Sequence, residues 1–138
     1  MKQSNNSTSF ESLGRRRKRL PFENIVKRVK PETRSRYELI VKELRKYDFN
    51  DRISIPGETF SYKKKKYIFL TFLGNTLNVH FRLDPKKYSD STIPVKDVSN
   101  IIRYKDLPAR LTIKSDLAAR RAVLLAKEIV KERKISLK

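Results

Sequence analysis

Residues 67–83, YIFLTFLGNTLNVHFRL, decide the fold because they predict a tight antiparallel hairpin. The first half is rich in β-branched and aromatic residues, and the second half alternates between apolar and polar side chains. A two-residue turn, Gly74-Asn75, between two such runs is a strong hairpin signal. The alternation predicts one buried face and one face in contact with water. The water-facing side chains would be Thr76, Asn78, His80 and Arg82.

The residues on either side of this hairpin predict two main helices and three more strands. Apolar residues at helical spacing over residues 32–47 predict the first helix, and Pro31 suits its start. Ser115 is a good N-cap for the second, over residues 116–133. The other predicted strands cover residues 52–55, 59–62 and 109–114, and residues 97–104 contain a helical turn.

This pattern predicts an α+β fold. We expect an antiparallel sheet of about five strands with two main helices packed against it, plus an extended basic N-terminal arm. The predicted division is a basic arm over residues 1–30, ending in a short amphipathic helical stretch, and an α+β domain over residues 31–138.

Three spaced motifs resemble a small, uncharacterised α+β domain of low-GC Gram-positive bacteria and their relatives. They are GNTLNVHFRLDPKKY at residues 74–88, VKDVS at residues 95–99 and PARLTIKSD at residues 108–116. The resemblance covers about residues 32–130. It implies the same fold and a bacterial origin, but it carries no known activity, and residues 1–30 lie outside it.

The charge of the chain predicts a partner with dense negative charge. The chain holds 34 Lys and Arg against 15 Asp and Glu, a formal net charge of +19. Residues 1–36 hold 11 basic and 3 acidic residues, whereas residues 37–138 hold 23 and 12, so the domain itself is basic. A polyanion would neutralise these charges and release counterions. The alternative is a solvated basic surface that serves solubility alone.

Nucleic acid is therefore the predicted partner, with RNA favoured over DNA. The protein would be a small RNA-binding protein, such as a component of the ribosome or of another ribonucleoprotein. The alternatives are a DNA-binding, nucleoid-type protein and a metal-dependent nuclease. Phosphate would be bound by the arm and by basic patches on the domain. The predicted contact residues are Arg15, Arg16, Arg17, Lys18, Arg19, Lys27, Arg28, Lys30, Lys63, Lys64, Lys65, Lys66, Arg120 and Arg121.

The lysine run at residues 63–66 has two interpretations of similar weight. It could contact backbone phosphate, or it could protect an exposed strand edge from aggregation. Residues 65–72, KKYIFLTF, partly match an RNA-recognition-motif signature, but Lys66 and Ile68 occupy its small-residue positions. These aromatic residues are therefore predicted to lie in the core. Base stacking would follow only if Tyr67 and Phe69 faced solvent.

No enzymatic machinery or cofactor site is predicted. His80, the only histidine, lacks a recognisable catalytic partner and is expected on the polar face of its strand. The sequence has no P-loop, no GxSxG and no zinc-ligand spacing. A nuclease would have to gather a metal ion with loop aspartates, which also suit turns. Those aspartates are Asp84, Asp90, Asp97 and Asp106.

The chain has no cysteine, which excludes disulfides and thiolate metal sites. It shows no apolar signal core and no apolar run of membrane-spanning length. The sequence therefore predicts a cytoplasmic protein with no membrane partner and no small-molecule substrate.

Overall fold

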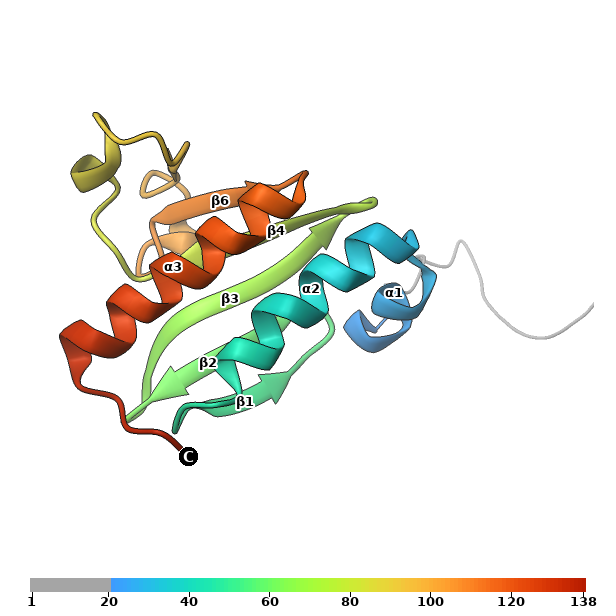
Figure 1. Cartoon of the computed structure of the whole chain (residues 1–138), viewed down its shortest axis with the longest axis horizontal. Helices are drawn as coiled ribbons and strands as arrows, with labels where there is room; N and C mark the ends of the chain where they lie inside the picture. The colour runs from blue at the N-terminus through green and yellow to red at the C-terminus, as the bar shows by residue number, and fades with distance from the viewer. Residues whose placement is uncertain (1–20) are drawn as a thin grey trace, which may run out of the picture.

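The computed structural model describes residues 21–138, which form a six-stranded antiparallel sheet with two long helices on one face (Figure 1). The elements in chain order are α1 (Phe22–Arg28), α2 (Pro31–Leu44), β1 (Asn50–Ile53), β2 (Glu58–Tyr62), β3 (Lys65–Leu73), β4 (Thr76–Phe81), the 3₁₀ helix η2 (Pro85–Tyr88), β5 (Lys96–Asp97), the 3₁₀ helix η3 (Ile102–Tyr104), β6 (Ala109–Ile113) and α3 (Asp116–Arg133). The α+β prediction is confirmed.

The sheet has the strand order β1-β2-β3-β4-β6-β5. The predicted hairpin forms its centre, because β3 and β4 pair from Leu73↔Thr76 to Ile68↔Phe81 around the Gly74-Asn75 turn. Gly74 has φ +62°, a left-handed conformation that a residue without Cβ adopts at little cost. The sheet has six strands rather than five, since the two-residue β5 pairs with β6 at the far edge.

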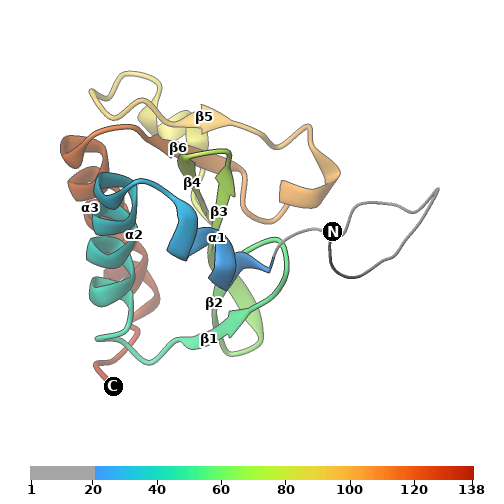
Figure 2. The same ribbon diagram turned by 90° about the vertical axis from the view of Figure 1, so that its right-hand side faces the viewer.

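Both main helices form where the sequence predicts them. Pro31 occupies the first turn of α2, and the Ser115 side chain caps α3 by accepting a hydrogen bond from the Ala118 backbone N–H at 3.1 Å. The two helices pack side by side on one face of the sheet (Figures 1 and 2). The core between them and the sheet includes Ile40, Leu44, Phe60, Leu70, Val79, Phe81, Leu111, Leu125 and Ile129.

The opposite face of the sheet differs from the prediction. Asn78 and His80 were expected in contact with water, but they are only 8% and 1% exposed. The reason is the segment between β5 and β6, which contains helix η3 and lies against this face (Figure 2). Its Tyr104 ring stacks on the His80 ring, with the ring centroids 3.8 Å apart. This face, the one turned away from α2 and α3, is called the open face below.

Helix α1 packs with the domain, although its residues were expected to belong to the arm. Its Phe22 is buried against Tyr37 of α2 and Phe72 of β3, with ring centroids 5.7 and 5.3 Å away. Val29, directly after the helix, is also buried. The folded part of the chain therefore starts near residue 22, and the arginine-rich run Arg15–Arg19 lies outside the described residues.

Candidate nucleic-acid interface

The tip of the β2–β3 hairpin carries four exposed lysines, Lys63, Lys64, Lys65 and Lys66, called the hairpin cluster below. None of them forms an ion pair with another residue of the described range 21–138. Lys63 and Lys64 make a two-residue turn with φ values of 50° and 68°. Such a turn favours Asn and Gly, because a residue with a Cβ is strained at positive φ. Lys63 and Lys64 therefore lower the local stability of the turn and place two ammonium groups at the tip.

Protection of a strand edge is still an open interpretation of the hairpin cluster. Edge strands carry charged residues because their unpaired backbone groups attract other strands. Strands β2 and β3 are interior strands of the sheet, but their hairpin end extends beyond both neighbours, because β1 pairs with β2 only as far as Ser61 and β4 pairs with β3 only as far as Ile68. The structure therefore leaves both interpretations of the lysine run open.

The residues Lys27, Arg28 and Lys30, called the α1 cluster below, lie at the other end of the sheet. All three are exposed, and the Lys30 backbone N–H donates to Oδ1 of Asn75 at 3.3 Å, in the turn that follows β3. Strand β3 has nine residues, so the turns at its two ends are about 26 Å apart. The hairpin cluster and the α1 cluster therefore lie at two ends of the sheet, at the two ends of β3 (Figure 1).

Arg120 and Arg121 belong to neither cluster. They lie in the first half of α3, on the helix-covered side of the sheet. The C-terminal end of α3 lies beside the hairpin, where the Arg133 guanidinium sits 5.8 Å from the Tyr67 ring centroid. Arg121 is twelve residues before Arg133, about 18 Å along the helix axis. Arg133, together with Arg82 at 5.5 Å from the same ring, adds positive charge next to the hairpin cluster instead.

The open face contains a cavity of about 520 Å³, called the sheet cavity below. Its polar side is formed by Asn78 and His80 of β4, Arg110 of β6, and Arg103 and Tyr104 of η3. Its apolar side is formed by Ile25, Ile55, Pro56, Phe69, Phe72 and Leu73. The lining contains two guanidinium groups and no carboxylate of the described residues. This combination suits an occupant that has both an apolar body and negative charge.

Two further cavities extend the sheet cavity in opposite directions. One, of about 310 Å³, shares Phe69, Arg103 and Tyr104 with it and reaches Lys66 of the hairpin cluster. The other, of about 250 Å³, shares Ile25 and Phe72 with it and reaches Arg28 of the α1 cluster. The three cavities share lining residues, so together they reach from Lys66 of the hairpin cluster to Arg28 of the α1 cluster.

A β-bulge in β3 brings Lys66 to this path. Phe60 pairs with Ile68 but Ser61 pairs with Lys66, which leaves Tyr67 as an extra residue. A bulge re-aims the neighbouring side chains, so Tyr67 and Ile68 are both buried while Lys66 lines a cavity on the open face. Tyr67 is thus a core residue as predicted, whereas Phe69 is half-buried and lines the sheet cavity.

The buried polar groups of the sheet cavity are incompletely paired. Neither Nδ1 of His80 nor Nε of Arg110 has a hydrogen-bond partner within the described part of the chain. Burial, with a smaller contribution from the Arg110 charge, lowers the pKa of His80 to about 4, so the imidazole is neutral at neutral pH. Leaving such a group unpaired costs about 1–3 kcal/mol. Oδ1 of Asn78 accepts from Thr112 Oγ1 at 2.8 Å, which leaves the amide NH₂ of Asn78 available.

The loop aspartates do not form a metal site. Asp84 accepts a hydrogen bond from the Lys86 backbone N–H at 3.0 Å, and Asp97 accepts one from Ser99 at 2.9 Å. The two hydrogen bonds to Ser99, from its hydroxyl and its backbone N–H, lower the pKa of Asp97. Between residues 21 and 138, no three His, Cys, Asp or Glu side chains gather in a way that could hold a metal ion. Asp84 and Asp97 therefore stabilise turns, as the turn interpretation predicts.

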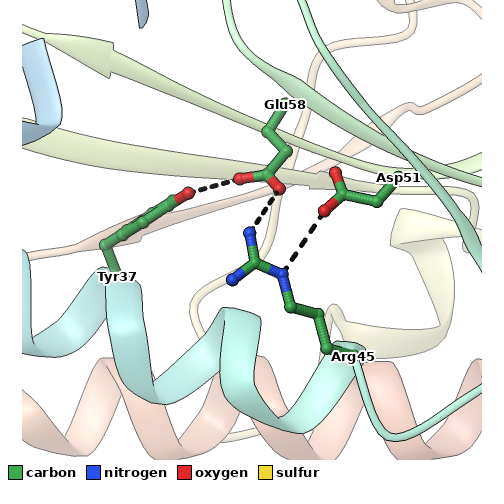
Figure 3. Close-up of polar contacts among 4 residues, drawn as sticks. All are labelled: Tyr37, Arg45, Asp51 and Glu58. Carbon is green, nitrogen blue, oxygen red and sulfur yellow. Dashed lines mark hydrogen bonds and ion pairs between the residues drawn. The ribbon is translucent and has the colours of Figure 1, made fainter. Parts of the chain in front are cut away.

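A second group of interacting polar side chains lies on the helix-covered face (Figure 3). Glu58 of β2 is fully buried, accepts a hydrogen bond from the Tyr37 hydroxyl, and pairs with Arg45 Nη2 at 3.2 Å. Arg45 also pairs with Asp51 of β1 at 3.3 Å. Burial and, to a smaller degree, the neighbouring Asp51 raise the pKa of Glu58 to about 7 against the Arg45 charge. These four residues link α2 to β1 and β2, and none of them lines a cavity of the open face.

Comparison of the chain with family models, curated proteins and solved structures finds no match in any of the three. The family resemblance of the three sequence motifs therefore stays a prediction. Of the residues 21–138 that the structure describes, no helix has the length and apolar character needed to cross a lipid bilayer.

Sequence reasoning missed the residues of the sheet cavity, namely Phe69, His80, Arg103, Tyr104 and Arg110. It places Phe69 in the core and His80 on a water-facing strand, and it gives the other three no role. No local sequence signal indicates these residues, because the burial of His80 depends on Tyr104, which comes 24 residues later in the chain.

Proposed function

We propose that this protein binds nucleic acid, with RNA favoured over DNA, as a component of a ribonucleoprotein such as the ribosome. The observation that carries the proposal is the hairpin cluster: four adjacent exposed lysines, two of them in a strained turn. Residues held in unfavourable backbone conformations collect at functional sites. A phosphate backbone is the partner that rewards closely spaced positive charges, because its neutralisation releases condensed counterions.

The rest of the basic surface supports the same class of partner. The α1 cluster is exposed and forms no ion pair with any other residue of the range 21–138. The arm adds five consecutive basic residues in front of α1. Arginine-rich segments frequently become ordered when they bind RNA, which is why RNA is favoured.

The test is the salt dependence of binding to labelled single-stranded RNA and to DNA of the same sequence. The variant Lys63→Asn with Lys64→Gly removes two charges and places favoured residues in the turn, so it should fold at least as well. Its control, Lys42→Gln with Lys127→Gln, removes two exposed charges from the helix layer. We expect only the hairpin variant to weaken binding, with a salt slope smaller by about one to two.

Three results would count against the proposal. If neither RNA nor DNA binds at low salt, the protein does not act through a phosphate backbone. If the hairpin and control variants lose equal affinity, the binding depends on net charge and the hairpin cluster has no particular role. Tighter binding to the DNA than to the RNA of the same sequence would overturn the preference for RNA in favour of a DNA-binding protein.

A further inference from the structure

We propose that the open face binds single-stranded nucleic acid, with one unpaired base inserted in the sheet cavity and the backbone running to the hairpin cluster. This inference rests on the proposed function and assigns it a substrate class and a site. The charge, the aromatic surface, the hydrogen-bonding groups and the shape of the cavity all favour this occupant.

The charge of the lining selects an anion. Arg103 is exposed at the mouth and Arg110 is half-buried on β6, and neither pairs with a carboxylate of residues 21–138. Guanidinium groups bind phosphate as planar, bidentate donors. One carboxylate, that of Asp106, lines the neighbouring cavity towards Lys66. Positive groups therefore outnumber the one carboxylate along the path, and no carboxylate of residues 21–138 lines the sheet cavity itself.

The aromatic groups select a flat apolar body. The rings of His80 and Tyr104 are stacked 3.8 Å apart at 11°, and Phe69 lies 6.0 and 6.3 Å from them. Bases stack on such side chains with little dependence on sequence, because every base has a π-face. Ile55 and Leu73 at the rim, which are 54% and 76% exposed, extend the apolar surface. An aromatic base fits this surface better than a sugar or a free phosphate does.

The polar groups inside the cavity suit the edge of a base. The Asn78 amide donates, and the neutral imidazole of His80 offers one donor and one acceptor nitrogen. An unpaired buried polar group is unfavourable in the free protein, and a ligand that hydrogen-bonds to it recovers that free energy. A purely apolar occupant would bind less well, because it would leave these groups without hydrogen-bond partners.

The absence of a side chain at Gly57 lets the Phe69 ring pack directly against the backbone. A Cβ at Gly57 would lie 2.2 Å from the Leu70 carbonyl oxygen and 2.8 Å from the Phe69 ring. The Phe69 ring therefore lies directly over the backbone of the β1–β2 connection. This contact preorganises one wall of the cavity before any ligand binds, which lowers the cost of binding.

The arrangement selects a single strand over a duplex. The sheet cavity of about 520 Å³ is in the range of small-ligand pockets, so it accommodates a nucleotide and not a base-paired helix. The path from Arg28 to Lys66 follows β3, about 26 Å long, so several nucleotides span it. A duplex would contact the two basic clusters but leave the cavity empty.

The experiment uses three labelled RNA probes of one sequence: the single strand, the same strand with abasic sites, and the strand annealed to its complement. The abasic strand keeps every phosphate and loses the bases. We expect the full chain to bind the intact strand about 5- to 100-fold more tightly than the abasic strand. Phe69→Leu should remove that preference, and Arg103→Gln should weaken binding to the intact strand. Lys42→Gln, an exposed change on α2, is the control for the lost charge.

His80 gives an independent reading because it is the only histidine of the chain. Its imidazole NMR signals should shift when the intact strand is added and stay in place with the abasic strand. Arg103 is exposed, so its variant should fold even if Phe69→Leu does not.

The results separate this inference from the proposed function. Equal binding of intact and abasic strands, with unmoved His80 signals, overturns the base site while nucleic-acid binding itself stands. Equal or tighter binding of the duplex also overturns it. If none of the probes binds, both the inference and the proposed function fail.

Discussion

The protein should have a nearly pH-independent stability between about pH 4 and 7, because two buried groups have opposing effects. Glu58 has its pKa raised from 4.5 to about 7, so it favours the folded state at low pH and loses this contribution as pH rises. His80 has its pKa lowered from 6.5 to about 4, so its contribution is present above pH 6.5 and is lost as pH falls. The pKa shifts are similar in size, so the two slopes nearly cancel.

Replacing either group should expose the effect of the other. With Glu58→Gln, His80 is the only one of the two groups that still titrates, and its contribution should raise the free energy of unfolding by about 2 kcal/mol between pH 5 and pH 7. With His80→Phe, which keeps a ring against Tyr104, it should fall by a similar amount over the same interval. The amide introduced by Glu58→Gln can accept from Arg45 with its carbonyl oxygen and donate to the Tyr37 hydroxyl, so the network of Figure 3 keeps its hydrogen bonds.

The measurement is urea unfolding at constant ionic strength from pH 4.5 to 7.5, followed by circular dichroism because the chain has no Trp. The m-value should stay constant, which shows that stability and not the denatured state has changed. The double variant Glu58→Gln with His80→Phe should be as flat as the wild type. If Glu58→Gln follows the wild-type curve in parallel, Glu58 does not titrate in this window and the reasoning is wrong.

Two further predictions concern the backbone. Gly57→Ala should destabilise the protein by about 2–3 kcal/mol, because its Cβ would clash with Leu70 and Phe69. Gly74→Ala has open space around it and should destabilise the protein by about 1–2 kcal/mol, because of strain at φ +62°. Equal unfolding free energies for the two variants would contradict the steric argument. Lys134→Gly should stabilise the protein by roughly 0.5–1 kcal/mol, because Lys134 ends α3 at φ 54°. Its control, Lys131→Gly inside the helix, should destabilise the protein by about as much. A thermal midpoint that falls in both variants would show that the end of α3 is not strained.

The sequence predicted the elements that neighbouring residues encode. The Gly74-Asn75 hairpin, the Ser115 cap and the apolar stripe of α3 are each encoded within a few positions, and each forms as expected. Strand β5 escaped prediction because two residues carry no periodicity, and it forms only by pairing with Arg110 and Ala109 of β6. Local signals therefore fix the elements, while the edge of the sheet depends on tertiary contacts.

The candidate site could be predicted only in part, for the same reason. The lysine run was visible as charge, but the positive φ values of its turn were not. Strand β3 is apolar on both faces, so alternation could not tell which side chains the helices cover, and the bulge at Tyr67 reverses the pattern within the strand. The burial of His80 depends on Tyr104, which is 24 residues further along the chain.

The sequence departs from the rules of local folding at three places in the described chain. One is Lys134, which ends α3 at φ 54° in the helix layer, where the core is otherwise apolar and the buried Glu58 has a partner on two sides. The other two are the strained lysines of the hairpin tip and the unpaired nitrogens of His80 and Arg110. Natural sequences keep such exceptions chiefly where function requires them. Lys66, next to the strained turn, lines a cavity that shares Phe69, Arg103 and Tyr104 with the sheet cavity, so the proposed single-stranded ligand would contact the hairpin tip and the unpaired nitrogens together.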